Sequence, residues 1–128
     1  MTKTAHMNQV VHFEIPADDT ERAKKFYDIF GWDIEGKEDY IALRTTPIDK
    51  NFMPKNPGAI NGGMIKRTDD VKAPVIAIHV ESVDTYIEKV VAAGGQLIMP
   101  KIEIPNMGYY AYVSDTEGNV LGLWEAAS

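Results

Sequence analysis

The chain has 128 residues, of which 45% are hydrophobic and 25% are charged, with a formal net charge of −6 and no cysteine. The acidic charge argues against nucleic-acid binding, because no basic stripe is present to neutralise phosphates, and the lack of cysteine excludes disulfides, thiolate metal sites and thiol nucleophiles. The N-terminal segment has no apolar core of a signal peptide, and no apolar run approaches the roughly 18 residues of a membrane span, so we expect a cytoplasmic protein with no membrane partner.

Residues 1–7 are expected to form a loose tail ahead of the first strand. That strand is predicted over Val10–Ile15, where apolar and polar residues alternate. A helix should follow from the capping residues Asp18–Thr20 to about Phe30, with a glycine stop at Gly31. Further strands are predicted near residues 32–35, 40–45 and 60–66.

The second half of the chain repeats this order of elements. A strand begins after Pro74, Ser82 caps a helix, and Gly94 and Gly95 end that helix. The turn at residues 115–118 then predicts a hairpin between the last two strands. The three strands that follow the helix are predicted at residues 96–99, 109–114 and 119–125.

An internal repeat decides the predicted fold. His12–Gly31 aligns with Val75–Gly94 without a gap, at an offset of 63 residues, and repeats of this kind define the architecture. Neither half alone buries enough surface to fold, so both must belong to one unit. We therefore predict an α+β fold with a single domain at residues 8–125, built from two βαβββ modules at about 8–67 and 73–125.

The faces of the two leading strands predict where a ligand would bind. A sheet with one helix on one face leaves its other face to be covered, and two such sheets can cup that face around a shared cavity. The apolar faces, Val11/Phe13/Ile15 and Ile76/Ile78/Val80, should pack on the helices. The opposite faces should point into the cavity; they carry Val10, His12, Glu14, Val75, Ala77 and His79.

Four segments in this order resemble the vicinal oxygen chelate superfamily, which includes glyoxalase I, extradiol dioxygenases and bleomycin-resistance proteins. They are VVHFEIPADDTERAKKFYDIFGW, GGMIKR, AAGG with MPKIEIPNMG, and SDTEGNVLGLWE, and they span about residues 8–125. The chain is most similar to the small glyoxalase/bleomycin-resistance branch. The resemblance implies paired βαβββ modules and a homodimer; whether modules pair within one chain or swap between chains stays open.

The resemblance also implies where a metal would be held: by one ligand on the first strand and one on the last strand of each module. Carried over by position, the first-strand ligands fall on His12 and Val75. An offset of 60 residues places the last-strand ligands on Gly122 and Gly62. Three of these four positions have no donor side chain, so we expect no cofactor and no catalytic metal.

A displaced metal site is the alternative at this stage. His12, Glu14 and His79 would supply two imidazoles and a carboxylate, the donors that a divalent metal accepts. Two residues along a strand span about 7 Å, however, so such a set would not keep the family's geometry.

Further side chains are predicted on the inner face as ligand-binding residues. They are His79, Tyr40, Tyr109, Trp124 and Met64. Core filling is the alternative for the aromatic ones. An inward carboxylate at Glu14 must be paired or have a shifted pKa, and Arg44 or Lys66 would be its partner.

The main functional hypothesis is therefore a metal-independent protein that binds a small organic molecule against apolar and aromatic walls. The first alternative is an enzyme: a metal-dependent lyase, isomerase or dioxygenase with displaced ligands, or a metal-free acid–base catalyst that uses Glu14 and His12. The second is a structural or regulatory dimer with a filled cavity. The sequence names no substrate.

Overall fold

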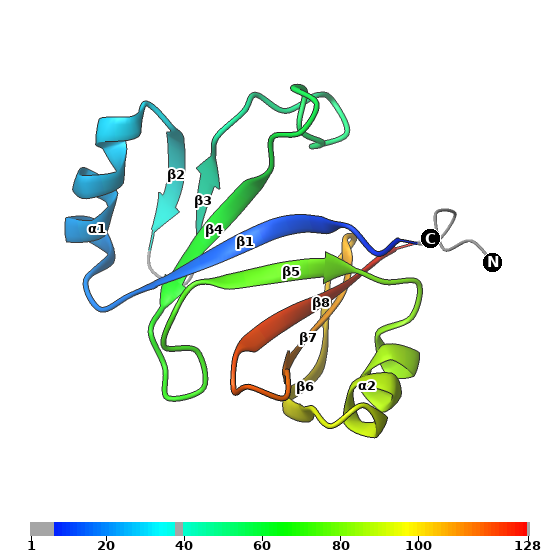
Figure 1. Ribbon diagram of the computed structural model, residues 1–128. Coiled ribbons are helices and arrows are strands. Elements are labelled where there is room, and N and C mark those ends of the chain that lie inside the picture. The colour runs from blue at the N-terminus through cyan, green and yellow to red at the C-terminus, as the bar shows by residue number, and fades with distance from the viewer. Residues whose placement is uncertain (1–6, 38–39, 128) are drawn as a thin grey trace. The chain divides into compact units, whose positions relative to one another are not determined.

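The computed structural model describes residues 7–37 and 40–127 (Figure 1). Of the predicted tail, only Met7 lies among the described residues, and it is 65% exposed. The chain divides into two compact units, one from His12 to Val75 and the other made of the chain up to Val11 and from Ile76 onward. In the described part of the chain, no helix is both long enough and apolar enough to cross a membrane.

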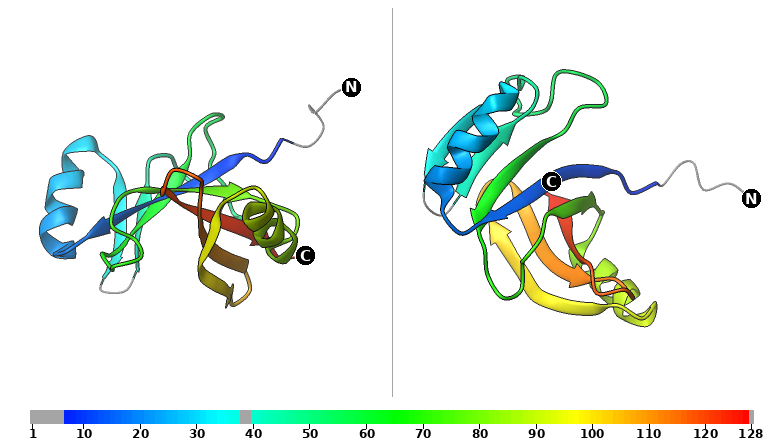
Figure 2. Two further views of the ribbon diagram at one scale, coloured as in Figure 1. Left: turned by 60° about the horizontal axis from the view of Figure 1, so that its bottom comes forward. Right: turned by 60° about the vertical axis from the view of Figure 1, so that its left-hand side comes forward.

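The first unit is a βαβββ module with four strands. Its strands lie in the order β2-β3-β4-β1, in which β1 pairs with β4 in parallel and the other neighbours are antiparallel. The helix crosses one face of these strands, as the right-hand view of Figure 2 shows. The elements are β1 (Val10–Ala17), α1 (Thr20–Tyr27), the 3₁₀ turn η2 (Asp28–Phe30), β2 (Asp33–Lys37), β3 (Tyr40–Arg44) and β4 (Asn61–Lys66).

The predicted signals set the ends of this first helix. The side chain of Asp19 accepts a hydrogen bond from the backbone N–H of Arg22 at 3.0 Å, which satisfies one of the free amides of the first turn. The helical path continues through η2 to Phe30 and ends at Gly31, whose φ of 76° is left-handed. The predicted helix to Phe30 is therefore confirmed.

The core of the first module lies between its sheet and α1. Ala17, Ile41, Leu43 and Met64 are buried there, with Phe13 and Ile15 packed against them. The Tyr27 and Trp32 rings stack at 5.6 Å with only 7° between their planes. The prediction that Phe13 and Ile15 face the helix is confirmed.

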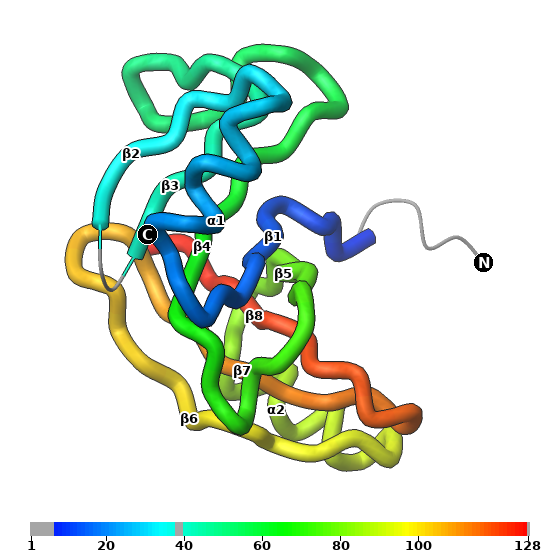
Figure 3. Tube along the Cα trace, turned by 90° about the vertical axis from the view of Figure 1, so that its left-hand side faces the viewer, coloured from blue at the N-terminus to red at the C-terminus, as the bar shows by residue number. Residues whose placement is uncertain are grey.

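The second unit repeats the plan, with strands in the order β5-β8-β7-β6. Figure 3 traces its chain from β5 through α2 to the hairpin of β6 and β7 and then to β8. Ser82 caps α2 by accepting a hydrogen bond from the N–H of Thr85 at 3.2 Å. The elements are β5 (Val75–His79), α2 (Val83–Ala92), β6 (Gln96–Ile104), β7 (Gly108–Ser114) and β8 (Val120–Ala126).

One predicted boundary in the second unit is wrong. The sequence predicts that a loop begins at Pro100, but β6 runs through this proline to Ile104. β6 is the outermost strand of its sheet, and its pairing with β7 shifts register twice between Leu97 and Ile102. Proline is tolerated on an edge strand and at a bulge because no ladder hydrogen bond is lost there.

Candidate functional site

The first module brings a histidine and a tyrosine together on the sheet face opposite α1. His12 Nε2 lies 3.3 Å from the hydroxyl oxygen of Tyr40. Burial lowers the pKa of His12 below its ordinary value of 6.5, so the imidazole is neutral at pH 7. It can accept or donate a hydrogen bond, depending on its tautomer.

Tyr40 is held in its neutral form as well. Its pKa is raised to about 12, first by burial and then by the negative charge of Glu14, while the Arg44 charge acts in the opposite direction. The residue as a whole is 47% exposed, but its phenol end rests on the backbone of Gly63, which explains how a half-exposed tyrosine has a desolvated hydroxyl. Tyr40 therefore lies on the same sheet face as His12, as predicted, and its role in ligand binding stays a prediction.

Glu14 lies on the same face and is 6% exposed. It pairs across the ladder with Gly63, and its carboxylate is close enough to Tyr40 to raise the pKa of the phenol. The predicted partner Arg44 instead makes ion pairs with Glu35 and, at 3.5 Å, with Asp33. The face therefore combines a buried carboxylate with a neutral imidazole and a neutral phenol.

The glycine on this face is Gly63, and the prediction of Gly62 is wrong. Gly62 pairs with Phe13, and a Cβ atom at Gly62 would lie 2.5 Å from the Phe13 ring, on the side of the sheet that α1 covers. Gly63 pairs with Glu14 and faces Tyr40. Because side chains alternate along a strand, an alignment error of one residue moves every side chain to the other face.

Met64 is also misplaced by the sequence interpretation. It was expected to line the ligand face, but it is fully buried in the core of the first module, on the side of α1. The same shift of one residue in β4 explains this error, since Met64 follows Gly63 and must point to the opposite face.

In the second module, the tyrosine on the face of Trp124 is Tyr110 and not Tyr109. Tyr109 packs against the core cluster beneath α2, and the Lys101 ammonium lies 4.8 Å from the centre of its ring. Tyr110 pairs with Trp124 across the ladder, and the ring centres of these two residues are 6.4 Å apart. The alternation Tyr109, Ala111, Val113 was the signal that could have revealed this, because Ala111 and Val113 form the buried core.

Trp124 and His79 share a face of the second module. They are partners in the parallel ladder of β5 and β8, and His79 is exposed. Tyr112 lies on the same face and packs edge-on against Tyr110 at 5.0 Å. The grouping of His79 with His12 and Glu14, which belong to the other unit, stays a prediction.

Comparison with known proteins gives the family. The family model for the bleomycin resistance protein-like N-terminal region matches residues 9–45. A glyoxylase-like domain-containing protein of Didymella fabae is 32% identical over 117 residues, which cover 87% of this chain and 88% of that protein. The chain belongs to the glyoxalase/bleomycin-resistance family.

Two further proteins are similar to this chain. The putative glyoxylase CFP32 of Mycobacterium tuberculosis is 30% identical over 123 residues, which cover 88% of this chain but only 44% of that protein. The chain thus spans less than half the length of this relative. A glyoxalase I mutant of Zea mays superposes with a TM-score of 0.63 and 18% identity, over 91% of this chain and 43% of that one; at this identity the likeness shows the fold alone.

The residues at the family's implied ligand positions do not fit a divalent metal. His12 has an imidazole, but Gly63 and Gly122 have no side chain and Val75 has a buried aliphatic one. Within the described residues, no three histidine, aspartate or glutamate side chains are grouped so that they could hold a metal ion. A divalent metal needs several hard donors that converge, and this face supplies too few.

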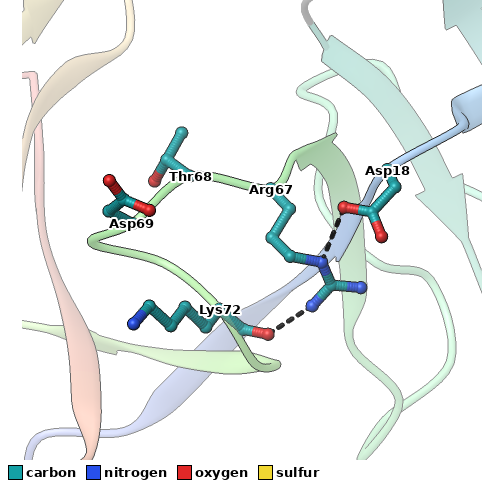
Figure 4. Close-up of a pocket in the computed structure, with 5 residues that line it drawn as sticks. All are labelled: Asp18, Arg67, Thr68, Asp69 and Lys72. Atoms are coloured by element: carbon teal, nitrogen blue, oxygen red, sulfur yellow. Dashed lines mark hydrogen bonds and ion pairs between the residues drawn. The ribbon is translucent and has the colours of Figure 1, made fainter.

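Two surface hollows of the first module are lined by residues other than His12. One, of about 410 Å³, is lined by charged and polar groups around the loop after β4 (Figure 4). In it, Arg67 Nε binds the Asp18 carboxylate at 3.0 Å and another guanidinium nitrogen donates to the carbonyl of Lys72. The other hollow, of about 360 Å³, lies beside Arg44 and Thr46. The charged side chains Arg67 and Arg44 beside these hollows are paired with carboxylates, so we keep the His12 face as the candidate site.

Proposed function

We propose that this chain binds a small organic molecule on the sheet face that carries His12, Glu14 and Tyr40, and that it does so without a metal. The observation that carries the proposal is the phenol of Tyr40, which lies on Gly63 where the family pattern would place a metal-binding side chain. Family membership supports a small-molecule role, since family members include bleomycin resistance-like and glyoxylase-like proteins.

The chemistry of the face suits binding by stacking and hydrogen bonds. The Tyr40 ring is half-exposed and offers an aromatic surface, while its hydroxyl and the His12 imidazole offer uncharged polar groups. Binding sites commonly combine apolar walls with a few polar groups that orient the ligand. Glu14 adds a buried negative charge that favours ligands with a hydrogen-bond donor at that end.

Two measurements on the purified protein test this function. Elemental analysis before and after treatment with a chelator should find no stoichiometric metal, and a thermal-shift screen of small organic molecules should give stabilising hits that the chelator does not change. The hits should weaken in Tyr40→Ala and persist in Tyr109→Ala, which alters a tyrosine beneath α2. Stoichiometric zinc, nickel or iron that is lost in His12→Ala would refute the proposal.

A metal-free acid–base catalyst is the second candidate. A neutral imidazole beside a neutral phenol, with a carboxylate nearby, contains the groups that proton transfer needs. A turnover that resists chelators and disappears in Glu14→Gln, while ligand binding persists, would favour this candidate over simple binding.

The expected assembly is a cytoplasmic homodimer. The length of CFP32, of which this chain covers 44%, leaves room for a second domain of the same size, and a second copy of this chain could take that place. Sedimentation equilibrium of the purified chain tests the dimer, and a monomer at all concentrations would contradict it.

A further inference from the structure

The two modules share a pair of residues that the internal repeat did not reveal. In the first, Tyr40 stands two residues before Ala42, the ladder partner of Gly63. In the second, Tyr110 stands two residues before Tyr112, the ladder partner of Gly122. In both modules, therefore, a tyrosine on the third strand lies diagonally across a glycine on the fourth.

The contact within each pair is close enough to exclude any side chain at the glycine. A Cβ atom at Gly63 would lie 2.5 Å from Cε1 of Tyr40, and its hydroxyl would be closer still. A Cβ atom at Gly122 would likewise lie 2.5 Å from Cζ of Tyr110, with the hydroxyl again closer. Real Cβ atoms do not come so near to other heavy atoms, so each tyrosine can keep its position only above a glycine.

We infer that Tyr40 and Tyr110 each occupy, in their own module, the space of the metal-binding side chain that the family pattern would place at Gly63 or Gly122, and that the half-exposed phenol of Tyr40 determines ligand specificity on the face of His12. The ligand role rests on the proposed function, whereas the position of the tyrosines rests on packing alone. The expected ligands are planar, largely apolar molecules that have a carbonyl or hydroxyl group at one edge. The ring would stack on the planar body, and the hydroxyl would hydrogen-bond the polar edge.

The packing of Tyr40 on Gly63 can be tested by measuring protein stability, without a ligand. Gly63→Ala should lower the unfolding midpoint strongly in the natural chain and much less in a Tyr40→Ala background, because the methyl group then meets no phenol. Gly62→Ala is the matched control: it contacts Phe13 on the opposite face, so Tyr40→Ala should not rescue it. If Gly63→Ala alone does not fold, recovery of a folded Tyr40→Ala/Gly63→Ala variant supports the pairing. Equal destabilisation by Gly63→Ala in both backgrounds would overturn it.

The expected ligand class is tested with three matched probes: 2-naphthol, 2-acetylnaphthalene and naphthalene. Their affinities are measured by the quenching of tryptophan fluorescence. Tyr40→Phe should weaken the two polar probes by about tenfold, as expected for the loss of one hydrogen bond. It should not change naphthalene binding. Tyr109→Phe, which alters a phenol beneath α2, should change none of the three.

The outcomes separate the inference from the function on which it rests. If the natural chain binds none of the probes, the proposed ligand class is overturned. The unfolding midpoints of Gly63→Ala in the two backgrounds still test the packing of Tyr40 on Gly63. If the polar probes bind equally well to the natural chain and to Tyr40→Phe, the role of the Tyr40 phenol is overturned, whereas small-molecule binding stands.

Discussion

Met64 provides a sharp test of which strand face belongs to the core. In Met64→Ala the γ, δ and ε atoms of a fully buried side chain are removed from the cluster of Ala17, Ile41 and Leu43. At about 0.8 kcal/mol for each carbon-sized group, the lost transfer free energy is about 2.4 kcal/mol. The cavity that remains adds to this, so we expect a loss of about 3 kcal/mol in the free energy of unfolding.

Urea unfolding followed by circular dichroism measures this loss. A change of this size should lower the midpoint of thermal unfolding by roughly 10 °C for a chain of this length. Met53→Ala is the matched control, because Met53 is 59% exposed and its removal should change stability by less than about 0.5 kcal/mol. Met64→Leu keeps most of the volume and should cost less than about 1.5 kcal/mol.

The opposite result is equally informative. If Met64→Ala unfolds at the same urea concentration as Met53→Ala and loses the response to ligand, Met64 lines the binding face. The register of β4 derived from its pairing with β1 would then be wrong, and with it the assignment of Gly63 to the face of His12.

Three further outcomes follow from the described contacts. Because burial lowers the pKa of His12 in the folded chain, the folded state should lose stability as the pH falls below 6.5, and urea unfolding of His12→Asn should lack this part of the pH dependence. Because the pKa of Tyr40 is raised from 10.0 to about 12, stability should fall as the pH rises above 10. Tyr40→Phe should remove a step near pH 12 from the tyrosinate absorbance titration, and an unchanged titration would contradict the buried phenol. Ser82→Ala should cost about 1 kcal/mol in urea unfolding, because Ser82 caps α2, and a neutral result would mean that the cap is replaced by water.

The order of the elements could be predicted from local signals because each signal acts within a few residues. Asp19 and Ser82 cap their helices as expected, and Gly31 ends the first one. The alternation in β1 assigned Phe13 and Ile15 to the helix side, where they lie. Pro100 misled the prediction because its place on an edge strand depends on the neighbours of that strand, which the local sequence does not contain.

The site residues were harder to predict because they depend on register between strands. Gly62 and Gly63 are adjacent and identical, so composition cannot decide which of them faces His12. The repeat alignment at an offset of 60 residues selected Gly62, whereas the ladder with Glu14 selects Gly63. In β7, three consecutive apolar residues, Tyr109 to Ala111, hid the alternation that places Tyr110 beside Trp124.

Each module has a tyrosine–glycine pair, and the two modules differ in the residues that lie beside it. Beside its pair, the first module carries His12 and Glu14, whereas the repeat places Val75 and Ala77 at these positions in the second. The first module therefore has polar groups beside its pair, whereas the second has the aromatic side chains of Tyr112 and Trp124 near its own pair. Glu14→Gln should accordingly change the affinity for 2-naphthol and leave the affinity for naphthalene unaffected. Equal effects of Glu14→Gln on the two probes would show that the polar groups of the first module serve the fold and not the ligand.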